Sequence, residues 1–166
     1  MNLLPNRTAL LVIDVQRALF EPPPFEADAV IVRINALASR ARAAGVPVIF
    51  VQHEDEGDLL ADTSGWELEP HLATTPSDLR VRKRTCDSFH GTPLHALLAE
   101  RDVRHLLVCG YASEFCVDTT VRSAARRATR SRWPPMRTPR TTSRTARASG
   151  SARTTRRRCA TSTASA

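Results

Sequence analysis

The sequence predicts a three-layer α/β/α fold with a mostly parallel, Rossmann-like sheet, because two kinds of segment alternate along the chain. Residues 8–15 (TALLVIDV) and 46–51 (VPVIFV) are almost wholly apolar, which is typical of strands buried on both faces. Residues 27–44, which lie between them, repeat apolar side chains with the spacing of a helix. Strands that alternate with helices in this way form parallel sheets through right-handed crossovers.

The same reasoning assigns the chain up to residue 127. Gly45 ends the first helix, and the proline-rich residues 21–24 and the acidic residues 54–78 are expected loops. Thr92 is the expected N-cap, and Pro93 the first helical position, of a helix over 92–100. The remaining expected elements are strands over 79–83 and 104–109, a turn over 110–113 and a helix over 115–127.

Charge and composition divide the chain after Arg127. Residues 1–127 hold 14 Lys and Arg against 17 Asp and Glu, a net charge of −3, whereas residues 128–166 hold 10 Arg and no acidic residue, a net charge of +10. The second segment contains no Val, Ile, Leu, Phe or Tyr, so it cannot bury enough apolar surface to offset its ordering entropy. We therefore expect one domain over 1–127 and a disordered basic tail over 128–166.

Several classes of protein are not expected for this sequence. It has no apolar run of about 18 residues, as a membrane-spanning helix would need, and its N-terminus lacks a secretory signal, so we expect a cytoplasmic protein. The four cysteines show no CxxC pair and no zinc-ligand spacing. A disulfide framework, a metal site and a cofactor are therefore not expected.

Three chemically reactive side chains follow three of the expected strands. Asp14 ends the first strand, Lys83 ends the third, and Cys116 lies just after the fourth at the start of a helix. The carboxyl ends of parallel strands meet at one edge of a sheet, where binding sites form. A thiol there can act as a nucleophile, with a lysine to stabilise its thiolate and a carboxylate to move its proton. Backbone amides around Ala112 and Cys116 are positioned to stabilise an oxyanion.

Each of these residues also has a simpler interpretation. Asp14 can cap a turn, Lys83 can be a solvated surface charge, and Cys116 can be a small buried hydrophobic residue. Taken one at a time, none of them identifies an active site, so the hypothesis depends on their joint arrangement.

The joint pattern resembles the isochorismatase-like cysteine hydrolases, a superfamily that includes nicotinamidases and N-carbamoylsarcosine amidohydrolase. The resemblance covers about residues 7–127 and rests on LLVIDVQRALF (10–20), VRKRTCDSFHGTPL (81–94) and LLVCGYASEFCVDTTVRSAARR (106–127). The spacing of D-x-Q, K-x(5)-F-x-x-T and G-x(5)-C-V-x-T-T is specific as a set.

This resemblance implies a fold, a reaction and a set of site residues. The catalytic Asp, Lys and Cys of the family fall on Asp14, Lys83 and Cys116, and its cis peptide bond falls at Tyr111–Ala112. The implied reaction is attack of the Cys116 thiolate on an amide-type carbonyl, loss of an amine or ammonia, and hydrolysis of the thioester. The implied partners are a small-molecule substrate and further copies of the chain, since family members often form homo-oligomers.

The resemblance also favours some substrates over others. True isochorismatases generally lack this cysteine, so Cys116 argues against hydrolysis of a vinyl ether. Nicotinamidases place a metal-binding Asp-x-His after the second strand, but residues 51–55 here read VQHED, so we expect no zinc or iron. Candidate substrate-binding residues are Phe20, His53, Trp66 and Phe89. His53 can equally be a hydrogen-bonded loop histidine, and an aromatic residue near a strand end is more often there for plain packing.

The segment after Arg127 departs from the family, so the resemblance implies that the C-terminal strands of the usual sheet are lost or replaced. The genetic code suggests a reason. One permitted encoding of residues 128–140, read after adding a single G, translates as GYAVTLAADAHTT, which is the expected family continuation. A one-base loss near codon 128 is therefore one interpretation. The alternatives are a natural basic tail that binds nucleic acid non-specifically through phosphates, and an inactive family member.

Overall fold

The described part of the protein is a four-stranded parallel sheet with helices on both faces. The computed structural model describes residues 7–130, with side chains described as far as Arg127. The strands lie in the order β3-β2-β1-β4, and every neighbouring pair is parallel. Their bounds are Thr8–Ile13 for β1, Val48–His53 for β2, Leu79–Lys83 for β3 and His105–Gly110 for β4.

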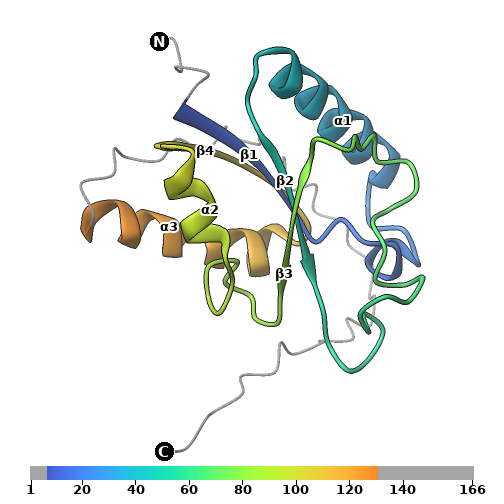
Figure 1. Cartoon of the computed structure of the whole chain (residues 1–166). Coiled ribbons are helices and arrows are strands. Elements are labelled where there is room, and N and C mark those ends of the chain that lie inside the picture. The colour runs from blue at the N-terminus through green and yellow to red at the C-terminus, as the bar shows by residue number, and fades with distance from the viewer. Residues whose placement is uncertain (1–6, 131–166) are drawn as a thin grey trace, which may run out of the picture.

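The helices divide between the two faces of the sheet (Figure 1). Helix α1 (Ala27–Ala43) packs on the face that carries Leu10 and Val12. Helices α2 (Leu94–Glu100) and α3 (Asp118–Arg130) cover the opposite face, where Leu11 and Ile13 lie. Because successive residues of a strand point to opposite faces, a continuous apolar run such as β1 requires this double cover. The predicted α/β class and layer order are therefore confirmed.

Several element boundaries differ from the sequence analysis by one or two residues: β2 spans 48–53 rather than 46–51, and β4 spans 105–110 rather than 104–109. Two further differences have a clear local cause. Strand β1 ends at Ile13 because Asp14 has a left-handed backbone, with φ of 53°, and cannot continue a strand. The N-cap of α2 is Pro93 rather than Thr92. The Thr92 hydroxyl still accepts a hydrogen bond from Leu94 N–H at 3.3 Å. Thr92 therefore caps the helix from the position before the N-cap.

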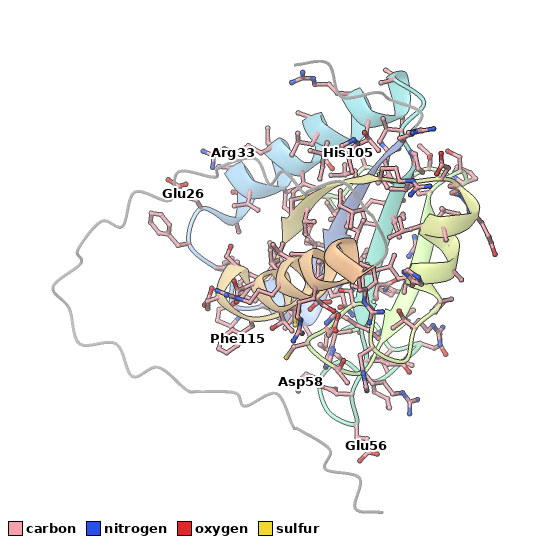
Figure 2. All side chains as sticks on the ribbon, turned by 90° about the vertical axis from the view of Figure 1, so that its left-hand side faces the viewer. Glu26, Arg33, Glu56, Asp58, His105 and Phe115 are labelled. Atoms are coloured by element: carbon pink, nitrogen blue, oxygen red, sulfur yellow. The ribbon has the colours of Figure 1, made fainter. Side chains whose placement is uncertain are left out.

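The entry into the last helix is also different from the expected plain α-helix. Residues Ser113–Val117 form a π-helical turn, and the regular α-helix α3 begins only at Asp118. Such π turns often mark functional positions, and this one contains Cys116. The side chain of Phe115 lies on the outside of the turn and is 51% exposed (Figure 2), whereas Cys116 is buried.

Strand β4 lies at the edge of the sheet in the described part of the chain. Of its residues only Leu106 is buried, and the others are half-buried. Helix α3 continues to Arg130, three residues beyond the boundary expected at Arg127. The disordered tail expected over 128–166 falls, from residue 131 onward, outside the described residues. No helix among residues 7–130 is long and apolar enough to cross a membrane.

Gly110 allows the end of β4 to lie against the end of β1. It pairs with Ile13, and its φ is 136°, a backbone conformation that side chains disfavour. A Cβ atom at this position would lie 2.0 Å from the carbonyl oxygen of Ile13. The next residue, Tyr111, donates its N–H to the same oxygen at 2.8 Å. The chain can therefore turn toward Cys116 while both strand ends stay in contact.

We predict that Gly110→Ala lowers the free energy of unfolding by at least about 2 kcal/mol, because backbone must move to admit the methyl group. Gly45→Ala is the matched control, since Gly45 also has a positive φ but nothing lies within 4 Å of its Cβ position. It should lose only about 1 kcal/mol. Urea unfolding measures both values, and equal losses would contradict the close approach described here.

Candidate active site

Asp14 is placed by the end of β1. It is 2% exposed, and its N–H donates to the carbonyl oxygen of Val51 at 2.8 Å. Asp is one of the few residues that tolerate a left-handed backbone, and this conformation ends the strand at the point where the carboxylate is needed. A strained backbone at a buried charged residue is typical of functional sites.

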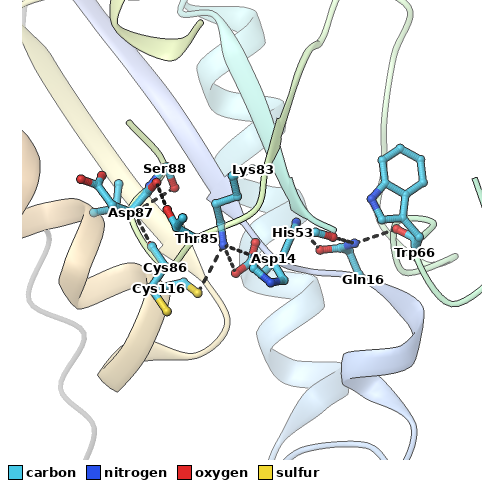
Figure 3. A network of polar contacts seen from close by, with 11 residues as sticks. Asp14, Gln16, His53, Trp66, Lys83, Thr85, Cys86, Asp87, Ser88 and Cys116 are labelled. Atoms are coloured by element: carbon cyan, nitrogen blue, oxygen red, sulfur yellow. Dashed lines mark hydrogen bonds and ion pairs between the residues drawn. The ribbon is translucent and has the colours of Figure 1, made fainter. Parts of the chain in front are cut away.

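Lys83 ends β3, and its side chain is completely buried. Its ammonium nitrogen lies 2.8 Å from Oδ2 of Asp14 and 3.3 Å from Sγ of Cys116. A third neighbour, Nδ1 of His53 at the end of β2, lies at 3.2 Å (Figure 3). The structure thus brings together the three residues that the sequence analysis placed at strand ends. A lysine ammonium has three protons, and each of them has one acceptor here.

The environment of Cys116 favours the protonated thiol over the thiolate. The pKa of the thiol is raised to about 12, by burial first and by the negative charge of Asp14 next, while the positive charge of Lys83 acts in the opposite direction. Oδ1 of Asp14 is buried and has no hydrogen-bond partner among the described residues.

The loop between β4 and Cys116 contains a cis peptide bond at Tyr111–Ala112, as the family resemblance implied. The carbonyl oxygen of Ala112 accepts hydrogen bonds from Phe115 N–H at 3.1 Å and from Val117 N–H at 3.4 Å. These bonds turn the Ala112 carbonyl into the π turn and fix the backbone on both sides of Cys116.

Gln16 is a site residue that the sequence analysis did not single out. It is fully buried, and its side-chain amide donates to the carbonyl oxygens of His53 at 2.9 Å and Trp66 at 2.8 Å. Its side-chain oxygen accepts from His53 N–H at 2.8 Å. The available signal was an amide side chain two residues after Asp14, within the D-x-Q motif.

His53 is half-buried and neutral beside the ammonium of Lys83. Burial lowers the pKa of its imidazole most, and the positive charge of Lys83 lowers it further. The carboxylates of Asp14, Asp55 and Glu54 act in the opposite direction and do not outweigh these effects.

The aromatic residues expected to bind substrate lie at different distances from this cluster. Phe20 is buried against Tyr111, with the ring centroids 5.7 Å apart. Trp66 carries Arg82 over its ring at 4.5 Å. Phe89 is buried in the apolar core between the sheet and α2 and α3, with Arg127 over its ring at 5.0 Å. Contact with a substrate stays a prediction for each of them.

A second polar network joins the loop after Lys83 to helix α3. The hydroxyl of Thr120 accepts from Ser88 N–H at 3.1 Å and lies 2.8 Å from the Ser88 hydroxyl. One turn further along α3, Ser123 donates to Oδ2 of Asp87 at 2.6 Å. Thr120 and Ser88 are both fully buried. The network ties the segment after Lys83 to the helix that follows Cys116, so it helps to hold these two residues in contact.

Two of the described cysteines, Cys109 and Cys116, are free thiols. Within residues 7–130, no three His, Cys, Asp or Glu side chains gather in a way that could hold a metal ion.

The protein is thus an α/β protein in which a cysteine, a lysine and an aspartate form a buried cluster at the carboxyl edge of a parallel sheet. The sequence model of the isochorismatase domain family matches residues 8–132, so the chain belongs to the isochorismatase family. This match extends beyond Arg127, and none of the observations supports the one-base loss suggested near codon 128.

Relatives at moderate identity carry hydrolase names. Streptothricin hydrolase of Streptomyces noursei is 43% identical over 121 residues, which are 70% of this chain and 48% of that protein. Ureidoacrylate amidohydrolase RutB of Pseudomonas savastanoi pv. phaseolicola is 30% identical, covering 74% of this chain and 66% of that protein. The crystal structure of a cysteine hydrolase from Pseudomonas syringae pv. phaseolicola matches with a TM-score of 0.70 at 30% identity. The match covers 76% of this chain and 68% of that chain. The chain thus spans about half the length of streptothricin hydrolase.

We predict that Thr120→Val lowers the free energy of unfolding by about 2 kcal/mol, because a buried N–H and a buried hydroxyl of Ser88 both lose their partner. Thr119→Val, one position earlier on the same helix, is the matched control and should change stability by less than about 0.5 kcal/mol. Thermal and urea unfolding give both values. A Thr120→Val protein as stable as the control would show that the network contributes nothing.

Proposed function

We propose that this protein is a cysteine hydrolase that cleaves a C–N bond of a small amide or carbamoyl compound through a thioester on Cys116. The observation that carries the proposal is the position of the Lys83 ammonium, in contact with both Asp14 and the Cys116 sulfur. This arrangement supplies a nucleophile, a base and a fixed positive charge within one buried cluster.

The first step is proton transfer and attack. Oδ1 of Asp14, which has no partner in the described part of the chain, takes the thiol proton of Cys116. The sulfur then forms a bond to the carbonyl carbon, and the carbonyl oxygen becomes an oxyanion. Backbone N–H groups of Ala112 and Cys116 are the proposed donors to that oxyanion, in the turn held by the hydrogen bonds of the Ala112 carbonyl.

The second step releases the leaving group and regenerates the thiol. The C–N bond breaks, and the proton held by Asp14 passes to the departing nitrogen, which leaves as ammonia or an amine. Asp14 then accepts a proton from water as that water attacks the thioester. The C–S bond breaks, the acid departs, and the proton returns to the sulfur of Cys116.

Lys83 acts throughout as a fixed charge. Its ammonium offsets the cost of burying the carboxylate of Asp14 and stabilises negative charge on sulfur as the thiol proton leaves. The proton that moves is therefore the one shared by Cys116 and Asp14, while Lys83 keeps all three of its own.

The substrate class follows from the site and from the names of the relatives. Streptothricin hydrolase, ureidoacrylate amidohydrolase and a cysteine hydrolase are among the proteins that this chain resembles. A thiol nucleophile with a carboxylate to protonate nitrogen suits an amide, ureido or lactam bond. These features support hydrolysis of a non-peptide C–N bond in a small molecule.

We predict that the purified chain releases ammonia or an amine from at least one of nicotinamide, N-carbamoylsarcosine and ureidoacrylate, and that Cys116→Ala abolishes this release. Rapid quenching followed by intact-mass spectrometry should show an acyl adduct on the wild-type protein and none on the variant. EDTA should leave the rate unchanged, because the Asp-x-His motif of metal-dependent relatives is absent from residues 51–55. Full turnover by Cys116→Ala would exclude the proposed nucleophile, and a folded wild-type chain inert toward the panel would favour the inactive-member alternative.

A further inference from the structure

We infer that His53 is a substrate-contacting residue, which presents its Nε2–H as a hydrogen-bond donor to an oxygen of the substrate beside the scissile bond. This inference rests on the proposed function. It depends on three observations: the contact of Nδ1 with Lys83, the open position of Nε2, and the clamp that Gln16 places on the His53 backbone.

The contact with Lys83 determines which ring nitrogen carries the proton. An ammonium group can only donate hydrogen bonds, so Nδ1 of His53, 3.2 Å from Nζ of Lys83, must supply the lone pair. A neutral imidazole has one N–H, and with Nδ1 as acceptor that N–H lies on Nε2. Four charged groups face the ring, Lys83, Asp14, Asp55 and Glu54, and burial together with Lys83 keeps the pKa of the imidazole below its usual value.

The Nε2 atom of His53 is not used to hold the described part of the fold together. No hydrogen bond of residues 7–130 uses it, and it is not among the buried polar atoms that lack a partner. It therefore faces accessible space, while the other side of the ring contacts the ammonium that holds Cys116 and Asp14. A donor in this position lies next to the reacting cluster and contributes to no bond inside the fold.

Gln16 keeps the ring in this position. Its side chain accepts from His53 N–H at 2.8 Å and donates to the His53 carbonyl oxygen at 2.9 Å, so both backbone groups of one residue are held by one amide. Gln16 also donates to Trp66, which fixes the amide itself. We assign Gln16 the part of a positioning residue, which acts on the substrate only through His53.

The substrate that fits this donor carries an oxygen acceptor in addition to the carbonyl that is attacked. Amides, ureido compounds and carbamoyl compounds that also bear a carboxylate have such an oxygen, whereas a simple alkyl amide or an unsubstituted urea has none. A neutral donor held in place in a partly buried site favours the first group, because the donor loses its water on binding and needs a replacement.

Three substitutions at His53 distinguish the role of Nδ1 from the role of Nε2. His53→Ala removes both, His53→Asn keeps a side-chain oxygen near the Nδ1 position, and His53→Gln carries an N–H out toward the Nε2 position. With the better substrate of N-carbamoylsarcosine and ureidoacrylate, both of which carry a carboxylate, we expect kcat/KM to fall about tenfold or more in His53→Ala. His53→Gln should recover most of this loss, and His53→Asn should recover little of it. His90→Ala, at an exposed position, is the control and should match wild type.

Alkylation of Cys116 by iodoacetamide provides the second readout, because it reports on the thiol without using the donor. His53→Asn should be alkylated at the wild-type rate and should keep the wild-type melting temperature. A wild-type value of kcat/KM in His53→Asn would overturn the inference. Equal losses of kcat/KM in His53→Asn and His53→Gln, accompanied by slower alkylation of Cys116, would overturn it as well. Either result leaves the proposed function standing as long as Cys116→Ala stays inactive, whereas an active Cys116→Ala removes the proposed function itself.

Discussion

The site depends on one buried ammonium group. Lys83 has no exposed side-chain surface, and removing a positive charge from water is costly unless acceptors replace the lost hydration. Asp14, Cys116 and His53 supply those acceptors from three other segments of the chain: the end of β1, the π turn before α3, and the end of β2. Parallel pairing brings β1, β2 and β3 to a common edge, and the network from Ser88 to Thr120 adds the helix that follows Cys116.

The choice of lysine is informative because the chain otherwise uses arginine. Among its 24 Lys and Arg residues, Lys83 is the single lysine. A planar guanidinium suits two oxygens on one carboxylate, whereas a compact ammonium can donate in three different directions. The nitrogen of Lys83 has a carboxylate, a thiol and an imidazole around it. Only a group that donates in three directions fits these neighbours, so arginine would not serve here.

Sequence reasoning found the residues whose chemistry is visible in isolation and missed those that act through neighbours. Asp14, Lys83 and Cys116 were predictable because each is a reactive side chain at a strand end. Gln16 and Thr120 were not, because their partners lie 37 and 32 residues away and polar side chains of this kind are common on surfaces. The sequence does not predict the π turn at Cys116, since the pattern of apolar residues is the same for a π turn and a plain α-helix.

The single lysine also gives the most direct test of the central claim, that one buried ammonium joins Asp14, Cys116 and His53. Protein labelled with ¹⁵N only at the lysine Nζ should give one ammonium resonance, visible at neutral pH because its protons are shielded from water. Carbamidomethylation of Cys116 should shift it. A resonance lost to fast exchange with water, or unmoved by modification of Cys116, would contradict the account.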